Sequence, residues 1–124
     1  MARRDEINDL ISGCLFLGHL VTMVADGTVG TIQGLFTISE GRGILYQLAA
    51  RVQGLELTAD EESAISRAKQ KLFTLLDQTA SQALLRELVG ALEAFELSEA
   101  EILKIAQCRL LLAGDQYSHT TRSN

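Results

Sequence analysis

The sequence predicts an all-α protein, a compact helical bundle of five to six helices. Apolar residues recur at spacings of three and four over most of the chain, which is the helical period. The apolar side chains are mainly aliphatic, since hydrophobic residues make up 47% of the chain and aromatic residues only 5%. Proline is absent from all 124 residues, so no predicted helix is interrupted by a missing N–H donor. This length suits one domain, and we predict a helical domain over residues 1–114 and a flexible polar tail over residues 115–124.

The first predicted helix ends at Asp26-Gly27 and carries one apolar seam, formed by Ile7, Leu10, Cys14, Leu17, Val21 and Val24. From Cys14 onward the helix is apolar nearly all round. We therefore expect it to be buried on more than one side, either within its own bundle or against a second copy. Its apolar run from Leu10 to Val24 is about 15 residues, shorter than a membrane span needs, and we expect no membrane partner.

The next segment, residues 26–43, holds five of the ten glycines together with several β-branched residues. Helix and irregular structure both fit this composition, and we favour helix. A short amphipathic helix is then predicted from Ile44 to Val52, closed by Gly54. Three further helices follow: one that begins after Thr58, one that begins after the break at 77–81, and one that begins after Ser98 and stops at Gly114.

A shift of 40 positions aligns residues 44–73 with residues 84–113 without a gap, within two predicted hairpin repeats at about 44–76 and 84–113. The match includes the corner of each segment, where Gly-Leu-Glu-Leu-Thr-Ala-Asp-Glu corresponds to Ala-Phe-Glu-Leu-Ser-Glu-Ala-Glu. In both corners a hydroxyl residue and a glutamate three positions later form the capping-box pattern, Thr58 with Glu61 and Ser98 with Glu101. We interpret the two segments as a duplicated helical hairpin, although convergence on the capping box is an alternative.

Both corners are acidic and form a candidate acidic patch, made of Glu56, Asp60, Glu61, Glu96, Glu99 and Glu101. Such a patch would suit a basic protein segment. Carboxylates in the first turn also stabilise a helix by themselves, because they complement its dipole and cap its amides. We expect no metal, because the chain has neither an Asp-x-Asp-x-Asp-Gly loop nor a His pair.

No catalytic residue and no cofactor are predicted. His19 lies five positions after Cys14, which points the two side chains apart on one helix, and we expect a core or interface histidine. Cys14 and Cys108 have apolar neighbours and are expected to be reduced and buried, which favours the cytoplasm. The second histidine, His119, lies in the polar tail.

The formal net charge of −5 disfavours nucleic acid, because it repels phosphate. Leu84 to Ile105 is similar to the helical half of small RNA-polymerase stalk subunits. That likeness implies polymerase association as one alternative, which would need the basic residues to gather on one face: Arg3, Arg4, Arg42, Arg51, Arg67, Lys69 and Lys71. A second alternative is a metal-dependent enzyme or sensor whose site assembles from dispersed residues: Cys14, His19, Asp26, Cys108 and the acidic corners.

The function we expect is a non-enzymatic protein–protein interaction module, such as an adaptor, an inhibitor or an assembly factor. Its first and last helices carry more apolar surface than one small bundle covers, so we expect self-association, with a dimer favoured. The candidate interface residues are Cys14, Leu17, Val21, Val24, Leu103, Leu110 and Leu111.

Overall fold

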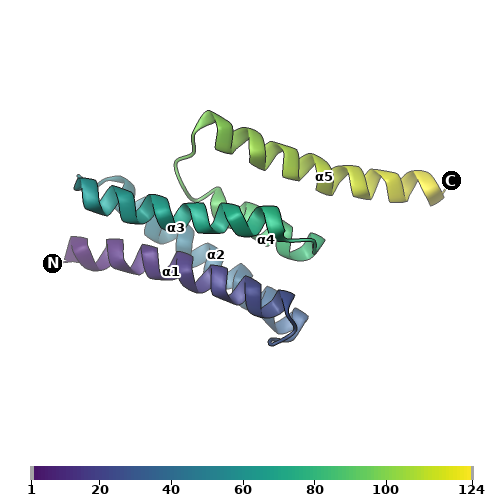
Figure 1. The fold of residues 1–124 in the computed structure, drawn as a ribbon, viewed down its shortest axis with the longest axis horizontal. Coiled ribbons are helices and arrows are strands. Elements are labelled where there is room, and N and C mark those ends of the chain that lie inside the picture. The colour runs from purple at the N-terminus through teal and green to yellow at the C-terminus, as the bar shows by residue number, and fades with distance from the viewer. Residues whose placement is uncertain (1, 124) are drawn as a thin grey trace.

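The computed structural model describes the backbone of residues 2–123 and the side chains of residues 5–114. The described residues form five helices and no strand (Figure 1), so the predicted all-α class is confirmed. The helices are α1 (Ala2–Ala25), α2 (Thr31–Gln53), α3 (Ala59–Gln78), α4 (Gln82–Leu92) and α5 (Glu99–Ser123).

The core forms around the apolar seam of α1. All six residues of that seam are buried, because α2 covers one side of α1 and α3 covers the other. α4 completes the core by packing on α2 and α3, and its short sequence is apolar enough to bury six side chains: Leu84, Leu85, Leu88, Val89, Ala91 and Leu92.

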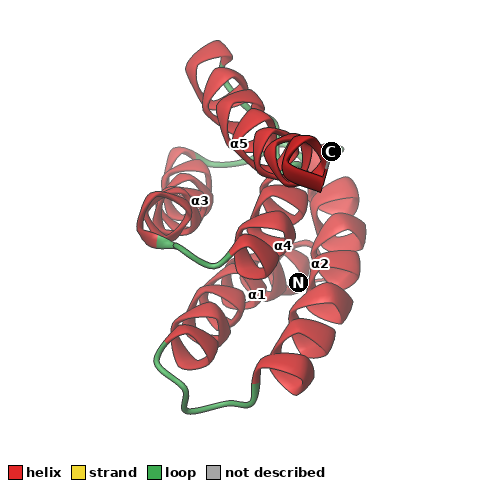
Figure 2. Ribbon diagram, turned by 90° about the vertical axis from the view of Figure 1, so that its right-hand side faces the viewer, coloured by secondary structure: helices red, strands yellow, loops and turns green. Residues whose placement is uncertain are grey.

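α2 and α3 do not pack along each other within the described part of the chain. Figure 2 shows them on opposite sides of α4. α5 packs mainly on α4, and polar contacts join it to α3. In Figure 1, α5 lies above the other helices and its C-terminal part extends beyond them. α5 is therefore the helix with the least cover from its own chain.

The segment 26–43 is helical from Thr31 onward, but the prediction of a separate short helix from Ile44 was wrong. One helix, α2, runs without interruption from Thr31 to Gln53. Two of its glycines face α1 without breaking the helix: Gly34 is buried against Val24, and a Cβ at Gly41 would lie 3.6 Å from Leu17. Gly27, with a φ of 84°, makes the turn after α1 as predicted.

The last helix does not stop at Gly114, as its sequence suggested, but continues to Ser123. A single glycine costs a helix about 1 kcal/mol relative to alanine, which does not end it when no proline follows. The prediction that residues 115–124, including His119, form a flexible tail concerns side chains that lie outside those the structure describes.

α1 is the one described helix that is long and apolar enough to cross a membrane, over Asp5–Ala25. Length and composition alone do not distinguish a span from the central helix of a folded core. Here 44% of the apolar window is buried inside the protein, against α2 and α3.

Candidate interaction surface

Both predicted capping boxes are formed. In the first corner the N–H of Glu61 donates to the Thr58 hydroxyl (3.2 Å) and the N–H of Thr58 donates to the Glu61 carboxylate (2.9 Å). The second corner repeats this arrangement with Ser98 and Glu101, at 3.3 and 2.9 Å. The two N-caps are therefore fixed 40 residues apart by the same hydrogen bonds, which gives α3 and α5 a common register.

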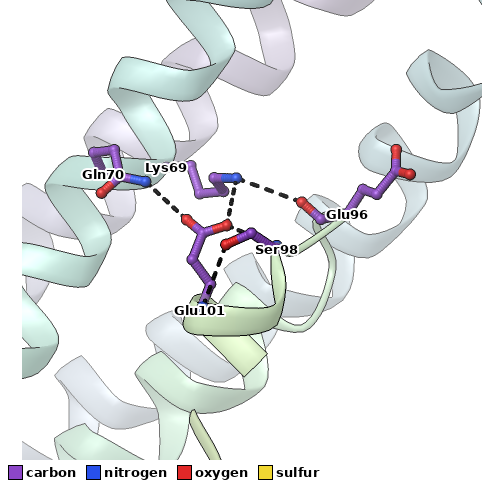
Figure 3. Close-up of polar contacts among 5 residues, drawn as sticks. All are labelled: Lys69, Gln70, Glu96, Ser98 and Glu101. Carbon is purple, nitrogen blue, oxygen red and sulfur yellow. Dashed lines mark hydrogen bonds and ion pairs between the residues drawn. The ribbon is translucent and has the colours of Figure 1, made fainter. Parts of the chain in front are cut away.

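The second corner is also tied to α3 through the Glu101 carboxylate (Figure 3). Lys69 Nζ lies 3.0 Å from Glu101 Oε1, and Gln70 Nε2 donates to Glu101 Oε2 at 2.7 Å. The same lysine donates to the backbone carbonyl of Glu96 at 3.4 Å. Burial acts to raise the pKa of Glu101, but the hydrogen bonds from the Ser98 backbone, Lys69 and the Ser98 side chain outweigh it and hold that pKa below its usual value.

The acidic patch is only partly free for a partner, because two of its carboxylates, Glu61 and Glu101, are used in capping. The other four members are exposed: Glu56, Asp60, Glu96 and Glu99. Both corners line a shallow cavity of about 400 Å³, which has leucines and Phe95 in its wall and Lys69 beside Glu62 and Glu96. The lysine neutralises part of the acidic charge there, and no metal-binding group of three side chains occurs among the described residues.

The candidate interface residues divide into two groups. Cys14, Leu17, Val21 and Val24 of α1 lie in the core, each with 7% or less of its surface exposed, so they are not available to a partner. Leu103, Leu110 and Leu111 of α5 are exposed by 60, 71 and 65%. The apolar seam of α1 is covered by α2 and α3, although Leu15 and Phe16 beside it are exposed, whereas α5 has no second helix in the described structure to cover its outer side.

Three further residues of α5, which the sequence did not single out, belong to this exposed surface. Ile102 is 54% exposed, and Ala106 and Ala113 are also exposed. Open grooves flank α5 on both sides, one of about 620 Å³ next to Glu93 and Leu97, and one of about 940 Å³ next to the α3–α4 turn. We call the six residues the α5 surface: Ile102, Leu103, Ala106, Leu110, Leu111 and Ala113.

The residues proposed for a dispersed enzyme or metal site do not converge in the described structure. His19 is exposed on α1, and Asp26 lies in the turn after α1, where hydrogen bonds from the hydroxyl (2.6 Å) and backbone N–H (3.1 Å) of Thr28 lower its pKa. Cys14 is buried in the core, and burial raises the pKa of its thiol to about 12. Cys108 is half-buried on α5, where burial and the charge of Asp77 raise its pKa. Both thiols are therefore poor nucleophiles at neutral pH.

Several basic side chains in the described part of the chain are held in ion pairs with acids of the same chain. Arg42 of α2 pairs with Glu87 at 3.2 Å, Lys69 of α3 pairs with Glu101, and Arg109 of α5 pairs with Glu93. Arg3 and Arg4 lie outside the described side chains. These ion pairs partly neutralise three cations on three different helices, α2, α3 and α5, while Arg51, Arg67 and Lys71 are exposed.

Fold and surface together define an all-α protein whose last helix exposes four large aliphatic side chains to solvent, while further exposed apolar residues lie on α1 and α2. Comparison with protein-family models, curated proteins and solved structures found no match to this chain.

Proposed function

We propose that the protein is a non-enzymatic interaction module, an adaptor, inhibitor or assembly factor, that binds another protein chain through the α5 surface. The observation that carries this proposal is the exposure of four large aliphatic side chains on one helix: Ile102, Leu103, Leu110 and Leu111. Clusters of this kind on a soluble domain mark contact sites, because leaving them in water is unfavourable. We also propose that the protein is cytoplasmic, because its two cysteines are expected to be reduced.

The common register of α3 and α5 supports the proposal, because it allows residues at the same position after each N-cap to be compared. Counted from the N-cap, the fourth and fifth positions are Glu62 and Ser63 on α3 but Ile102 and Leu103 on α5. The twelfth and thirteenth positions of α3 are Gln70 and Lys71, and on α5 these positions are Leu110 and Leu111. All four α3 residues are exposed, so a helix that needs only its own chain carries polar residues at these positions.

The same register supports the proposal that 44–76 and 84–113 are copies of one helical unit. The corners share their capping hydrogen bonds and their turn geometry. The units differ in how they pack, since α4 and α5 contact each other, whereas α2 and α3 lie apart. α3 packs on both α1 and α4, and α5 lacks a neighbour equivalent to α1.

The test gives α5 the polar residues that α3 carries at the same positions, in the variant Ile102→Glu, Leu103→Ser, Leu110→Gln and Leu111→Lys. Because these side chains are exposed, we expect the helical circular dichroism to be retained and the unfolding free energy to change by no more than about 1 kcal/mol. Sedimentation of the fluorescently labelled protein, alone and in extract of the native host, should show complexes for the original sequence and a monomer for the variant.

A matched control is the double variant Ile32→Glu and Phe36→Lys, which alters two exposed apolar residues of α2. We expect this control to sediment like the original sequence. Loss of helical structure in the α5 variant would mean that the α5 surface belongs to the chain's own fold. Unchanged sedimentation of a folded α5 variant would equally contradict the proposed function.

A further inference from the structure

Four residues of the α5 surface form a regular stripe: Leu103, Ala106, Leu110 and Ala113 follow one another at spacings of three, four and three. This spacing produces a narrow seam on one side of a helix, as in paired helices. All four residues are exposed, and leucine alternates with alanine along the stripe.

The alternation makes the stripe complementary to itself when a second copy runs in the opposite direction. With the two-fold axis at position 108, Leu103 faces Ala113 of the other copy and Leu110 faces Ala106, so every layer holds one large and one small side chain. Such layers interdigitate at a constant distance between the helix axes. In a parallel pair, layers of two leucines would alternate with layers of two alanines, which leaves gaps at the alanines.

The charges around the stripe are compatible with pairing of two identical copies. No ionisable side chain lies on the stripe itself. The flanking cations, Lys104 and Arg109, are already paired within the chain, with Asp77 (2.5 Å) and Glu93. Glu99, exposed one turn before Leu103, is the acid in line with the stripe, so a basic partner would find one acidic side chain at its end, whereas a second copy brings an uncharged stripe.

The area available fits one small symmetric interface rather than a large obligate one. The four residues of the stripe, without Ile102 and Leu111, present roughly 300 Å² in each copy, so a symmetric pair buries on the order of 600 Å² plus what its flanks add, at the low end of specific interfaces. We therefore expect monomers and dimers to exchange at micromolar concentrations.

From these observations we infer that the partner of the α5 surface is a second copy of this chain, bound through antiparallel packing of the two α5 helices with leucine against alanine in each layer. This inference rests on the proposed function and adds the identity of the partner and the direction of pairing. A two-fold arrangement of this kind is closed, so it yields a dimer rather than a filament.

The test measures dimer dissociation by sedimentation equilibrium of the full chain and three variants. Leu110→Glu should weaken dimerisation at least tenfold, while Phe36→Glu, at a similarly exposed apolar site of α2 (68% against 71%), should change it less than twofold. Ala106→Leu should also weaken it, although it adds apolar surface, because two leucines then occupy one layer. Combining Ala106→Leu with Leu110→Ala should restore dimerisation, since each layer again pairs one leucine with one alanine.

Several results would overturn self-pairing. They are a dimer that Ala106→Leu strengthens, a dimer that the combined variant does not restore, and a dimer that depends on Phe36. A monomer at all concentrations would overturn it too, and binding of an apolar dye then separates the two proposals. If the monomer binds the dye and Leu110→Glu removes this binding, the α5 surface is free and the proposed function stands with another partner. If the monomer binds no dye, both proposals fail.

Discussion

Lys69 on α3 and Glu101 on α5 form an ion pair of 3.0 Å whose acidic member also closes the capping box at the start of α5. Both side chains are 15% exposed, so water screens the pair only partly. One carboxylate thus starts the last helix and fixes it to the third. Because α5 packs mainly on α4, the Lys69–Glu101 ion pair helps to fix the position of α5 relative to α3.

Glu101→Gln should destabilise the protein by about 1–2 kcal/mol, because it weakens the cap and removes the charge facing Lys69. Urea unfolding measures this change. The matched control is Glu99→Gln, an exposed carboxylate in the same first turn, which should cost no more than about 0.5 kcal/mol. Equal effects of the two substitutions would show that Glu101 contributes only through the helix dipole.

The pH dependence of stability should carry a contribution from Glu101. The pKa of Glu101 in the folded protein lies below its ordinary value of 4.5. Its contribution is therefore complete above the pKa of an unfolded glutamate, and it is lost as the pH falls through the lower, folded value. The difference in unfolding free energy between the original sequence and Glu101→Gln should shrink from about pH 6 to about pH 3. A difference that is constant over this range would contradict the assignment.

Gly34→Ala should destabilise the protein by about 1–3 kcal/mol, even though alanine favours helix, because the added Cβ would overlap Val24 of α1. Gly43→Ala is the control on the same helix. Nothing lies within 4 Å of its Cβ position, so this variant should be stabilised by up to about 1 kcal/mol. Thermal unfolding compares the two. Adding Val24→Ala to Gly34→Ala should cost less than the sum of the single changes.

Features that depend on residues close together in the sequence could be predicted more fully than features that depend on how the helices pack. The caps at Thr58, Ser98 and Gly27 could be predicted because they involve residues within three or four positions of each other. The continuity of α2 could not be predicted, because only the structure shows that Gly34 lies against α1 and so serves packing within an unbroken helix. The sequence predicted that the first helix is buried on more than one side, but not that its own chain supplies both neighbours, nor that α5 packs mainly on one helix.

Cys14 and Cys108 should differ in their reaction with a disulfide reagent. Cys14 is buried with a pKa of about 12, so we expect it to react only when the protein unfolds. Cys108 is half-buried and should react at least about tenfold faster in the folded protein. Rates measured with Cys14→Ala and Cys108→Ala assign each phase. Fast labelling of Cys14 under native conditions would contradict its place in the core.

The attachment of α5 mainly to α4 has a consequence for how the molecule opens. α1 to α4 share a core in which each helix packs on at least two others, so their amide hydrogens should exchange only through global unfolding. α5 can detach by losing its contacts with α4 and a few polar links, and its amides should exchange through a smaller, separate opening that pairing with another chain would suppress. Native-state hydrogen exchange at two protein concentrations would reveal the last helix as the part of the chain whose order depends on binding to another chain.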